Sequence, residues 1–162
     1  MGAGKSAVLA EASDILALRH IEHAAIDLDA LGLAHLGSAA GNDGVMYRNL
    51  QSVCNNYASA GVTRLLLARA MEGRAELELC RGAVSAKNTV TCRLTASIDV
   101  MQQRVERREL GVSRREYVAR VAKLNSILDG ARLEDFSVSN ENRSWTEVAR
   151  EVLVKAGWIA GG

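Results

Sequence analysis

Short apolar segments alternate with amphipathic segments along the whole chain, and this alternation restricts the fold more than any other feature. Residues 62–68 form a compact apolar run, typical of a buried strand in a parallel sheet. Residues 7–19 carry apolar side chains at helical spacing instead. Alternating strands and helices form parallel strands joined by right-handed crossovers. We therefore predict an α/β fold, a three-layer αβα sandwich around a parallel sheet, with residues 1–162 as a single domain.

Local start and stop signals give the predicted boundaries. Ser113 with Glu116, and Ser144 with Glu147, have the spacing of a capping box, in which two side chains satisfy backbone N–H groups at a helix start. Gly111 is predicted to end the preceding helix, because glycine readily adopts the left-handed conformation common there. The predicted helices cover residues 7–19, 46–60, about 75–84, 98–111, 113–128 and 144–157, the predicted strands cover 24–31, 62–68, 88–96 and 135–140, and a glycine-rich loop covers 32–44.

The chain begins with Gly2-Ala3-Gly4-Lys5-Ser6, the last part of the phosphate-binding pattern G-x-x-x-x-G-K-[ST], directly before a predicted helix. In this pattern glycines let backbone N–H groups approach phosphate oxygens, the lysine reaches the terminal phosphates, and the serine hydroxyl ligates Mg²⁺. The helix adds the positive end of its dipole. The alternative is a helix that merely begins with a turn of small residues. We predict that nucleotide phosphates bind at Gly2, Ala3, Gly4, Lys5, Ser6 and Ala7.

The first glycine of this pattern, and the strand that usually precedes it, would lie before Met1. We expect either that Met1 is a late start or a boundary, or that the sheet lacks a strand that is normally central. Loss of that strand would leave its two neighbours with unpaired backbone groups, each costing about 1–3 kcal/mol. Because a domain is stable by only about 5–15 kcal/mol, we expect the sequence to be an incomplete form of a working domain, or to fold poorly.

Two carboxylates lie in the second predicted element. Asp27 and Asp29 share one face of the predicted strand 24–31, because side chains alternate along a strand. One would help to hold Mg²⁺ or its water shell, and the other would accept a proton from an attacking hydroxyl. We assign Asp27, with Ser6, to the metal, and Asp29, nearer the strand end, to the base. The alternative is that both aspartates only form a turn.

Arginines supply a further group of candidates. Arg104 and Arg108 lie four residues apart on one helical face. We predict a lid over about residues 104–116, whose two guanidinium groups close on the transferring phosphate. The alternative is a solvated helix in which these arginines pair with Glu106 and Glu109.

Two other residues lie at the carboxyl ends of predicted strands, where ligands bind to parallel sheets. Arg69 either contacts an anionic acceptor or forms a surface ion pair with Glu72. Asn140 follows the last predicted strand, where an adenine base would rest, although asparagine is also common in turns and at helix starts.

The composition narrows the range of partners. The formal net charge is +1 and aromatic residues make up 4% of the chain, so neither a basic surface nor a stacking platform for nucleic acid is expected. No run of 18 apolar residues predicts a membrane span and nothing resembles a secretory signal, so we expect a cytoplasmic protein without a membrane partner. Cys54, Cys80 and Cys92 are odd in number and widely spaced, which favours buried reduced thiols over disulfides or a zinc site.

These patterns together resemble the P-loop small-molecule kinases, the group that includes gluconate kinase, adenylylsulfate kinase, shikimate kinase and chloramphenicol phosphotransferase. The resemblance rests on Gly4-Lys5-Ser6, on Ile26-Asp27-Leu28-Asp29, on the arginines at 104 and 108, and on the ending at residues 135–153. The second half also resembles the tunicamycin-resistance ATP-binding protein. The resemblance implies an ATP-binding αβα sandwich of the P-loop NTPase type, N-terminally truncated by one strand. The ending departs from the pattern, with Ser139-Asn140 where relatives often have an Asp.

The leading hypothesis is a kinase that transfers the γ-phosphate of ATP to a hydroxyl of a small molecule with the help of Mg²⁺. An alternative is a nucleotide-binding domain without catalytic activity. A nucleic-acid 5′-hydroxyl kinase is the weakest, because it requires a basic groove. In the leading hypothesis the catalytic residues are Lys5, Asp29, Arg104 and Arg108, Asn140 joins the phosphate loop in binding ATP, and Ser6 and Asp27 hold the metal.

Overall fold

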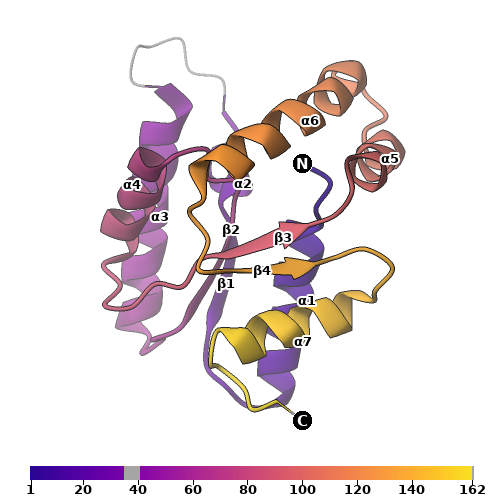
Figure 1. The fold of residues 1–162 in the computed structure, drawn as a ribbon. Coiled ribbons are helices and arrows are strands. Elements are labelled where there is room, and N and C mark those ends of the chain that lie inside the picture. The colour runs from indigo at the N-terminus through magenta and orange to yellow at the C-terminus, as the bar shows by residue number, and fades with distance from the viewer. Residues whose placement is uncertain (35–40, 162) are drawn as a thin grey trace.

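The structure of the chain is a computed structural model, and it describes residues 1–34 and 41–161 (Figure 1). Helices and strands alternate in these ranges as predicted, so the chain is a mixed α/β protein. The helices are α1 Lys5–Leu18, α2 Leu28–Leu31, α3 Gly41–Ser59, α4 Arg74–Val84, α5 Ile98–Arg108, α6 Arg114–Ala131 and α7 Trp145–Lys155, and the strands are β1 Ala24–Asp27, β2 Leu65–Ala68, β3 Cys92–Thr95 and β4 Phe136–Ser139. None of the helices in the described ranges has the length and apolar character that a membrane crossing requires.

The four strands form two parallel pairs rather than one sheet. β1 pairs with β2 from Ala24 beside Leu65 to Asp27 beside Ala68, and β3 pairs with β4 along its full length. The prediction of parallel strands is therefore confirmed. Within the described residues, however, no backbone ladder joins β2 to β3. Figure 1 shows the two pairs crossing at an angle, with α5 and α6 beyond β3 and with α3 and α4 beyond β1 and β2.

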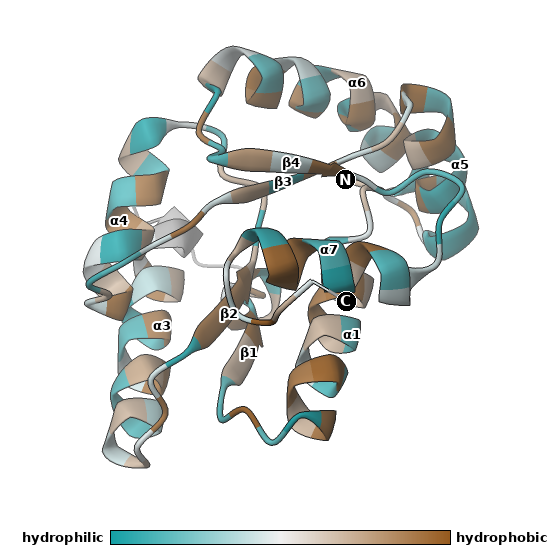
Figure 2. Ribbon diagram, turned by 60° about the horizontal axis from the view of Figure 1, so that its bottom comes forward, coloured by the Kyte–Doolittle hydropathy of each residue, from teal (hydrophilic) through white to brown (hydrophobic). Residues whose placement is uncertain are grey.

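Buried apolar side chains gather in three clusters. One joins α1 to α7 and β4, a second joins β1 and α2 to α3 and α4, and a third joins α5 to α6. Figure 2 shows that β1 and β2 are mostly apolar and that α1 and α7 each carry apolar patches. The three cysteines are free thiols; Cys54 and Cys80 are buried as predicted, whereas Cys92 is only half-buried. Burial raises the pKa of the Cys80 thiol to about 11.

The local signals identify one helix start correctly and miss two other boundaries. The Ser144 hydroxyl accepts a hydrogen bond from the Glu147 N–H, and the Glu147 carboxylate accepts one from the Ser144 N–H, so this capping box is confirmed. The box predicted at Ser113 is wrong, because its ψ of 3° differs from the extended backbone of a capping residue and its side chain makes no capping bond. The predicted end at Gly111 is also wrong, since α5 ends at Arg108 and Gly111 has no positive φ.

The end of the strand before the predicted glycine-rich loop and the start of the helix after it both differ from prediction. β1 ends at Asp27, and residues 28–31 of the predicted strand form the single helical turn α2. α3 begins at Gly41, inside the predicted loop at residues 32–44, and residues 35–40 of that loop lie outside the described residues. Both changes occur immediately beside the carboxyl end of β1, which shapes the site described next.

Candidate functional site

The loop before α1 requires glycine at two positions. Gly2 and Gly4 have φ values of 76° and 86°, in the left-handed region that favours glycine. A Cβ atom at Gly2 would collide with the carbonyl group of Met101, and one at Gly4 would collide with the side chains of Asn140 and Trp145. The loop is therefore held closely between α5 and the start of α7.

This loop leads into the amino-terminal end of α1, which has no side-chain cap. The first hydrogen bond of the helix joins the Val8 N–H to the Gly4 carbonyl at 2.9 Å. The N–H groups of Lys5, Ser6 and Ala7 find no acceptor among the described residues. Free N–H groups at the positive end of a helix dipole bind anions. The predicted phosphate site therefore presents backbone donors.

The Lys5 side chain is half-buried at this end of α1. Burial lowers the pKa of its ammonium group, whereas the carboxylates of Asp29 and Asp27 act in the opposite direction. In the part of the chain that the structure describes, the ammonium group forms no hydrogen bond or ion pair. An incoming anion would supply the missing partner, since charge-assisted hydrogen bonds are strong in partly buried positions.

Ser6 and Asp27, the two residues predicted to hold a metal, lie together. One carboxylate oxygen of Asp27 accepts a hydrogen bond from the Ser6 hydroxyl at 2.5 Å, and the other accepts one from the Asp29 N–H at 3.1 Å. The second bond makes Asp27 the N-cap of α2, so the turn-forming alternative also describes this residue. A hydroxyl and a carboxylate are oxygen ligands that fit Mg²⁺, which usually takes one or two carboxylates and fills its other positions with phosphate oxygens and water.

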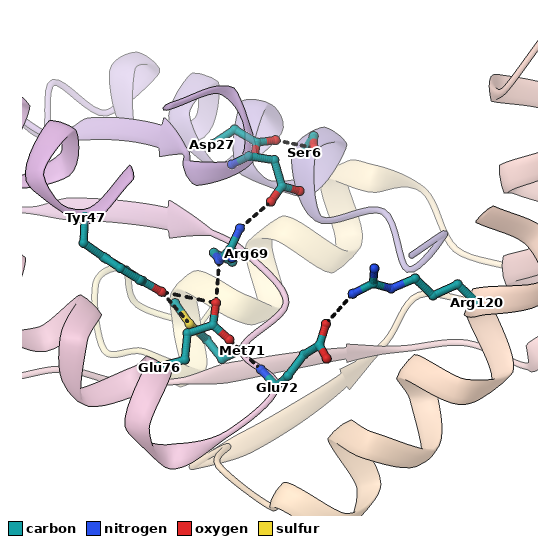
Figure 3. Close-up of polar contacts among 9 residues, drawn as sticks. Ser6, Asp27, Tyr47, Arg69, Met71, Glu72, Glu76 and Arg120 are labelled. Atoms are coloured by element: carbon teal, nitrogen blue, oxygen red, sulfur yellow. Dashed lines mark hydrogen bonds and ion pairs between the residues drawn. The ribbon is translucent and has the colours of Figure 1, made fainter. Parts of the chain in front are cut away.

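Asp29, the predicted base, contacts Arg69, and Figure 3 shows Arg69 between Asp27 and Glu76. The Nη1 atom of Arg69 lies 3.0 Å from Oδ1 of Asp29, and its Nε atom lies 2.7 Å from Oε1 of Glu76. The Arg69 side chain is 17% exposed, whereas that of Asp29 is 65% exposed. No described residue bonds to Oδ2 of Asp29, so this oxygen can accept a proton or a hydrogen bond from a ligand.

The surroundings of Arg69 differ from the predicted surface ion pair with Glu72. Glu76 instead binds Arg69, and its Oε1 also accepts a hydrogen bond from the Tyr47 hydroxyl at 3.2 Å. Burial, and then the charge of Glu76, raise the pKa of Tyr47. Glu72 pairs with Arg120 of α6 at 2.7 Å. No sequence pattern pointed to Glu76 or Tyr47, because both reach this site from helices whose packing fixes their position.

Arg104 and Asn140, predicted to contact ATP, instead form hydrogen bonds to backbone carbonyl groups of the loop before α1. The guanidinium group of Arg104 donates to the Asn140 carbonyl at 2.8 Å and to the Gly2 carbonyl at 3.4 Å, and it lies 5.3 Å from the ring centre of Trp145. The Asn140 amide donates to the Ala3 carbonyl at 2.6 Å. Asn140 is fully buried, and its Oδ1 has no partner among the described atoms.

The structure does not bring Arg108 together with Arg104. Arg108 is 62% exposed and pairs with the adjacent Glu109 at 2.8 Å, as in the alternative of a solvated helix. The predicted lid at residues 104–116 contains the end of α5, the start of α6 and a connection in which Leu110 and Val112 are exposed. Asp27 and Asp29 therefore lie close to Lys5 and Ser6, and Arg108 acts on this group through its charge, since burial and, more weakly, Arg108 lower the pKa of Lys5.

Comparison with known proteins leaves the chain without a match, both among family models and among curated proteins. The function is therefore argued from the geometry of this site.

Proposed function

We propose that the chain binds ATP with Mg²⁺ at the amino-terminal end of α1 and transfers its γ-phosphate to a hydroxyl of a small molecule. The observation that carries this proposal is a convergence of three features. The uncapped helix start, the unpartnered ammonium group of Lys5 and the Ser6–Asp27 pair all meet at the carboxyl end of β1 in the described part of the chain. Backbone donors, a cation and metal-binding oxygens are the groups that phosphoryl transfer requires.

We also propose that the two strand pairs belong to a three-layer arrangement of the P-loop type. Its support is the packing of α1 with α7 in one cluster and of α3 with α4 in another, with β2, β3 and β4 contributing to the first cluster and β1 and β2 to the second. In such α/β folds the ligand lies at the carboxyl ends of the strands. The cytoplasmic location and the lack of a nucleic-acid partner stay predictions.

Each residue has a defined part in the proposed reaction. The N–H groups of residues 5–7 and the Lys5 ammonium bind phosphate oxygens and stabilise the charge that develops on them. Ser6 and Asp27 would hold Mg²⁺, which neutralises phosphate charge when bound. Asp29 Oδ2 accepts the proton of the acceptor hydroxyl while the oxygen of that hydroxyl forms the new bond to the γ-phosphorus. The bond from that phosphorus to the bridging oxygen breaks, and ADP leaves.

A second candidate function is nucleotide binding without transfer. It is favoured by the contacts of two predicted catalytic groups. Arg104 is bound to carbonyl groups of its own chain, and Asp29 already neutralises Arg69. In this case the phosphate-binding residues keep their roles, and Asp29 acts only as a structural partner of Arg69.

Isothermal titration calorimetry with ATP and Mg²⁺ tests the binding step. We expect the Lys5→Ala variant to bind ATP roughly a hundredfold more weakly, because it loses a charge-assisted contact in a partly buried site. Lys123→Ala is the matched control, since Lys123 is an exposed lysine of α6. Circular dichroism establishes that both variants are folded. Equal ATP affinity in the two folded variants would reject the proposed site.

Measuring ADP release with a panel of hydroxyl acceptors separates the two candidate functions. Transfer predicts ADP release that depends on an acceptor and stops when EDTA removes Mg²⁺. Binding alone predicts calorimetric heat with ATP but no ADP release with any acceptor of the panel.

A further inference from the structure

Glu76 of α4 binds three other parts of the chain beside the candidate site. Its Oε1 atom accepts hydrogen bonds from Nε of Arg69 at 2.7 Å and from the Tyr47 hydroxyl at 3.2 Å, and its Oε2 atom accepts one from the Glu72 N–H at 2.8 Å. Figure 3 shows these partners arranged around the Glu76 carboxylate. Because the partners come from α3, from the end of β2 and from the connection to α4, the carboxylate is fixed from several directions.

The position of Glu76 in α4 favours a negative charge there. Glu76 lies in the first turn of the helix, whose N-cap residue Gly73 supplies no side-chain cap. The amino-terminal end of a helix dipole stabilises a carboxylate. The Glu76 side chain is 18% exposed, and hydrogen bonds to an ionised carboxylate are stronger than those between neutral groups. Glu76 is therefore a strong partner for Arg69.

Glu76 thereby determines what Arg69 can bind. The Arg69 side chain is 17% exposed, and two atoms of its guanidinium group are bound to carboxylates, Nε to Glu76 and Nη1 to Oδ1 of Asp29 at 3.0 Å. A guanidinium group is planar, so two such bonds fix its orientation. Arg69 in turn holds Oδ1 of Asp29, which leaves Oδ2 as the oxygen that receives the acceptor proton in the proposed reaction.

The charges around Arg69 oppose the binding of a further anion. Arg69, Asp29 and Glu76 carry one positive and two negative charges. The neighbouring pair of Glu72 with Arg120, at 2.7 Å, is neutral as a whole. An anionic group beside Asp29 would therefore meet two carboxylates whose shared cation is already bound. To reach Arg69 it would have to displace one of them, and like charges at such short range repel strongly in a partly buried position.

Two other cations lie close to this site, and each has another partner. The charges of Asp29 and Arg108 both act on Lys5, so Lys5 is close to Asp29. In the proposed function, however, Lys5 binds the phosphates of ATP. Arg108 is 62% exposed and pairs with Glu109 at 2.8 Å, so solvent and a carboxylate both screen its charge. We therefore assign neither cation to the acceptor.

We propose that Glu76 is a positioning residue that sets the chemical class of the acceptor. By binding Arg69 it commits the guanidinium group to Asp29, so that this group is not available to an anionic substrate. The acceptor is therefore an alcohol that carries no carboxylate, phosphate or sulfate group beside the reacting hydroxyl, such as a polyol or an amino alcohol. This inference rests on the proposed function, and it decides against the anionic acceptor that the position of Arg69 in the sequence allows.

Side-chain nuclear magnetic resonance of the full chain tests whether Glu76 excludes anions from Arg69. The probes are glycerate, an anionic alcohol, and glycerol, its uncharged counterpart, and each is titrated while the Nε–Hε signal of Arg69 is followed. Glu76→Gln removes the charge and nearly preserves the size of the side chain. Glu78→Gln is the matched control, since Glu78 is a 56% exposed glutamate of the same helix.

We expect glycerate to bind at Arg69 at least about tenfold more tightly in Glu76→Gln than in the unsubstituted chain, because a charge-assisted partner of Arg69 is lost. Glu78→Gln should behave like the unsubstituted chain, and glycerol should give no such difference. A merely structural role for Glu76 would not change the affinity of Arg69 for an anion. Equal responses of Arg69 to glycerate in Glu76→Gln and in the unsubstituted chain, whether strong or absent, would overturn the proposal.

Tyr47→Phe is the second variant if Glu76→Gln does not fold. It keeps the aromatic ring in the core and removes one of the hydrogen bonds to Glu76. The affinity of Arg69 for glycerate should then rise roughly threefold. Tyr57→Phe, at an exposed tyrosine of the same helix, should leave the affinity unchanged. An unchanged affinity in Tyr47→Phe contradicts the proposal.

ADP release shows whether the same preference governs transfer. With ATP and Mg²⁺, glycerol and 3-amino-1,2-propanediol should give roughly tenfold higher kcat/KM than glycerate in the unsubstituted chain, because like charges repel the anion, and Glu76→Gln should narrow this difference. A preference of the unsubstituted chain for glycerate would overturn the proposal. A lack of ADP release with every acceptor would count against the proposed function instead, because the response of Arg69 to glycerate does not depend on transfer.

Discussion

The two strand pairs share one parallel arrangement, but their carboxyl ends carry different kinds of contact. At the end of β1 and β2, side chains contact other side chains at an exposed edge, as in Asp29 with Arg69. Beyond β3 and β4, side chains bind the backbone of the loop before α1, as Asn140 does to Ala3 and Arg104 does to Gly2. The first pair therefore presents side chains of the proposed reaction, and residues that follow the second pair support the loop.

This difference indicates that chemistry and support are separable in this molecule. Asp29 is 65% exposed, so its ion pair with Arg69 contributes at most about 1 kcal/mol to stability, and Asp29 can change without unfolding the chain. A buried donor that loses its partner costs about 1–3 kcal/mol, so residues at the second end affect folding before they affect chemistry. Substitutions at the end of β1 and β2 should therefore lower the reaction rate more than the stability, and those beyond β3 and β4 should lower the stability more than the reaction rate.

The largest effect is expected at Asp29. Asp29→Asn should reduce the rate of phosphate transfer by roughly 10²–10⁴, because the amide cannot accept the proton of the acceptor, while ATP affinity stays nearly unchanged. Asp129→Asn is the matched control, since Asp129 is 61% exposed and pairs at 2.8 Å with Arg93, whose side chain is 13% exposed. Steady-state kinetics and urea unfolding measure the two properties. Equal losses of rate in both variants would remove Asp29 from the reaction.

The next largest effect is expected on the free energy of unfolding, at Gly4 in the loop before α1. Gly4→Ala should lower the free energy of unfolding by about 1–3 kcal/mol through backbone strain alone, and by more because its Cβ atom collides with Asn140 and Trp145. Gly61→Ala isolates the strain, since Gly61 has a φ of 90° and a Cβ atom added there would meet no described atom within 4 Å. Urea unfolding of both variants measures the difference. A loss at Gly4 no greater than that at Gly61 would mean that the loop has room to move.

A smaller effect on stability is expected at Arg104. Its size decides whether Arg104 supports the loop before α1 or contacts the transferring phosphate. As a support, Arg104→Ala should lower the free energy of unfolding by about 1–3 kcal/mol, with a raised KM for ATP and little change in kcat. Arg107→Ala, at an exposed position of the same helix, should change neither. A large fall in kcat with unchanged stability would instead restore the predicted closing of Arg104 on the phosphate.

The sequence predicted those parts of the molecule that depend on local order. Ser6 and Asp27 meet because a helix start and a strand end lie at one edge, which the alternation of elements implies. The capping box at Ser144 formed because its backbone is extended, whereas Ser113 has the same side-chain pattern on a different backbone. A capping pattern therefore predicts a helix start only where the preceding chain permits the extended conformation.

Contacts between distant segments were not predictable from spacing. Asn140 binds Ala3 across 137 positions of the chain, and Arg69 binds Glu76 because α4 packs beside β2. The four-residue spacing of Arg104 and Arg108 correctly placed them on a helix, but it did not show that Arg104 packs toward the loop while Arg108 lies in solvent. These roles follow from which face of each helix is buried.

The smallest predicted effect is a loss of stability at acid pH, caused by two carboxylates near the ends of β3 and β4, Glu141 and Glu147. The hydroxyl and N–H of Ser144 lower the pKa of Glu147 from its ordinary value of 4.5, and those of Ser97 lower the pKa of Glu141, with the backbone bond as the larger cause there. A lowered pKa in the folded state means that these carboxylates stabilise the fold fully above the ordinary pKa. This stabilisation is lost as the pH falls through the lowered values.

The part of the free energy of unfolding that these two carboxylates contribute should therefore be level above about pH 5 and decline below the ordinary pKa of 4.5. Glu147→Gln keeps a hydrogen-bonding oxygen and removes the charge, so its decline should be slightly shallower than that of the unsubstituted chain. Urea unfolding at a series of pH values measures both slopes. Because both carboxylates are exposed, the difference between the two slopes is expected to be smaller than the effect of Gly4→Ala. A steeper decline in the variant would show that the Ser144–Glu147 box does not stabilise α7 through its charge.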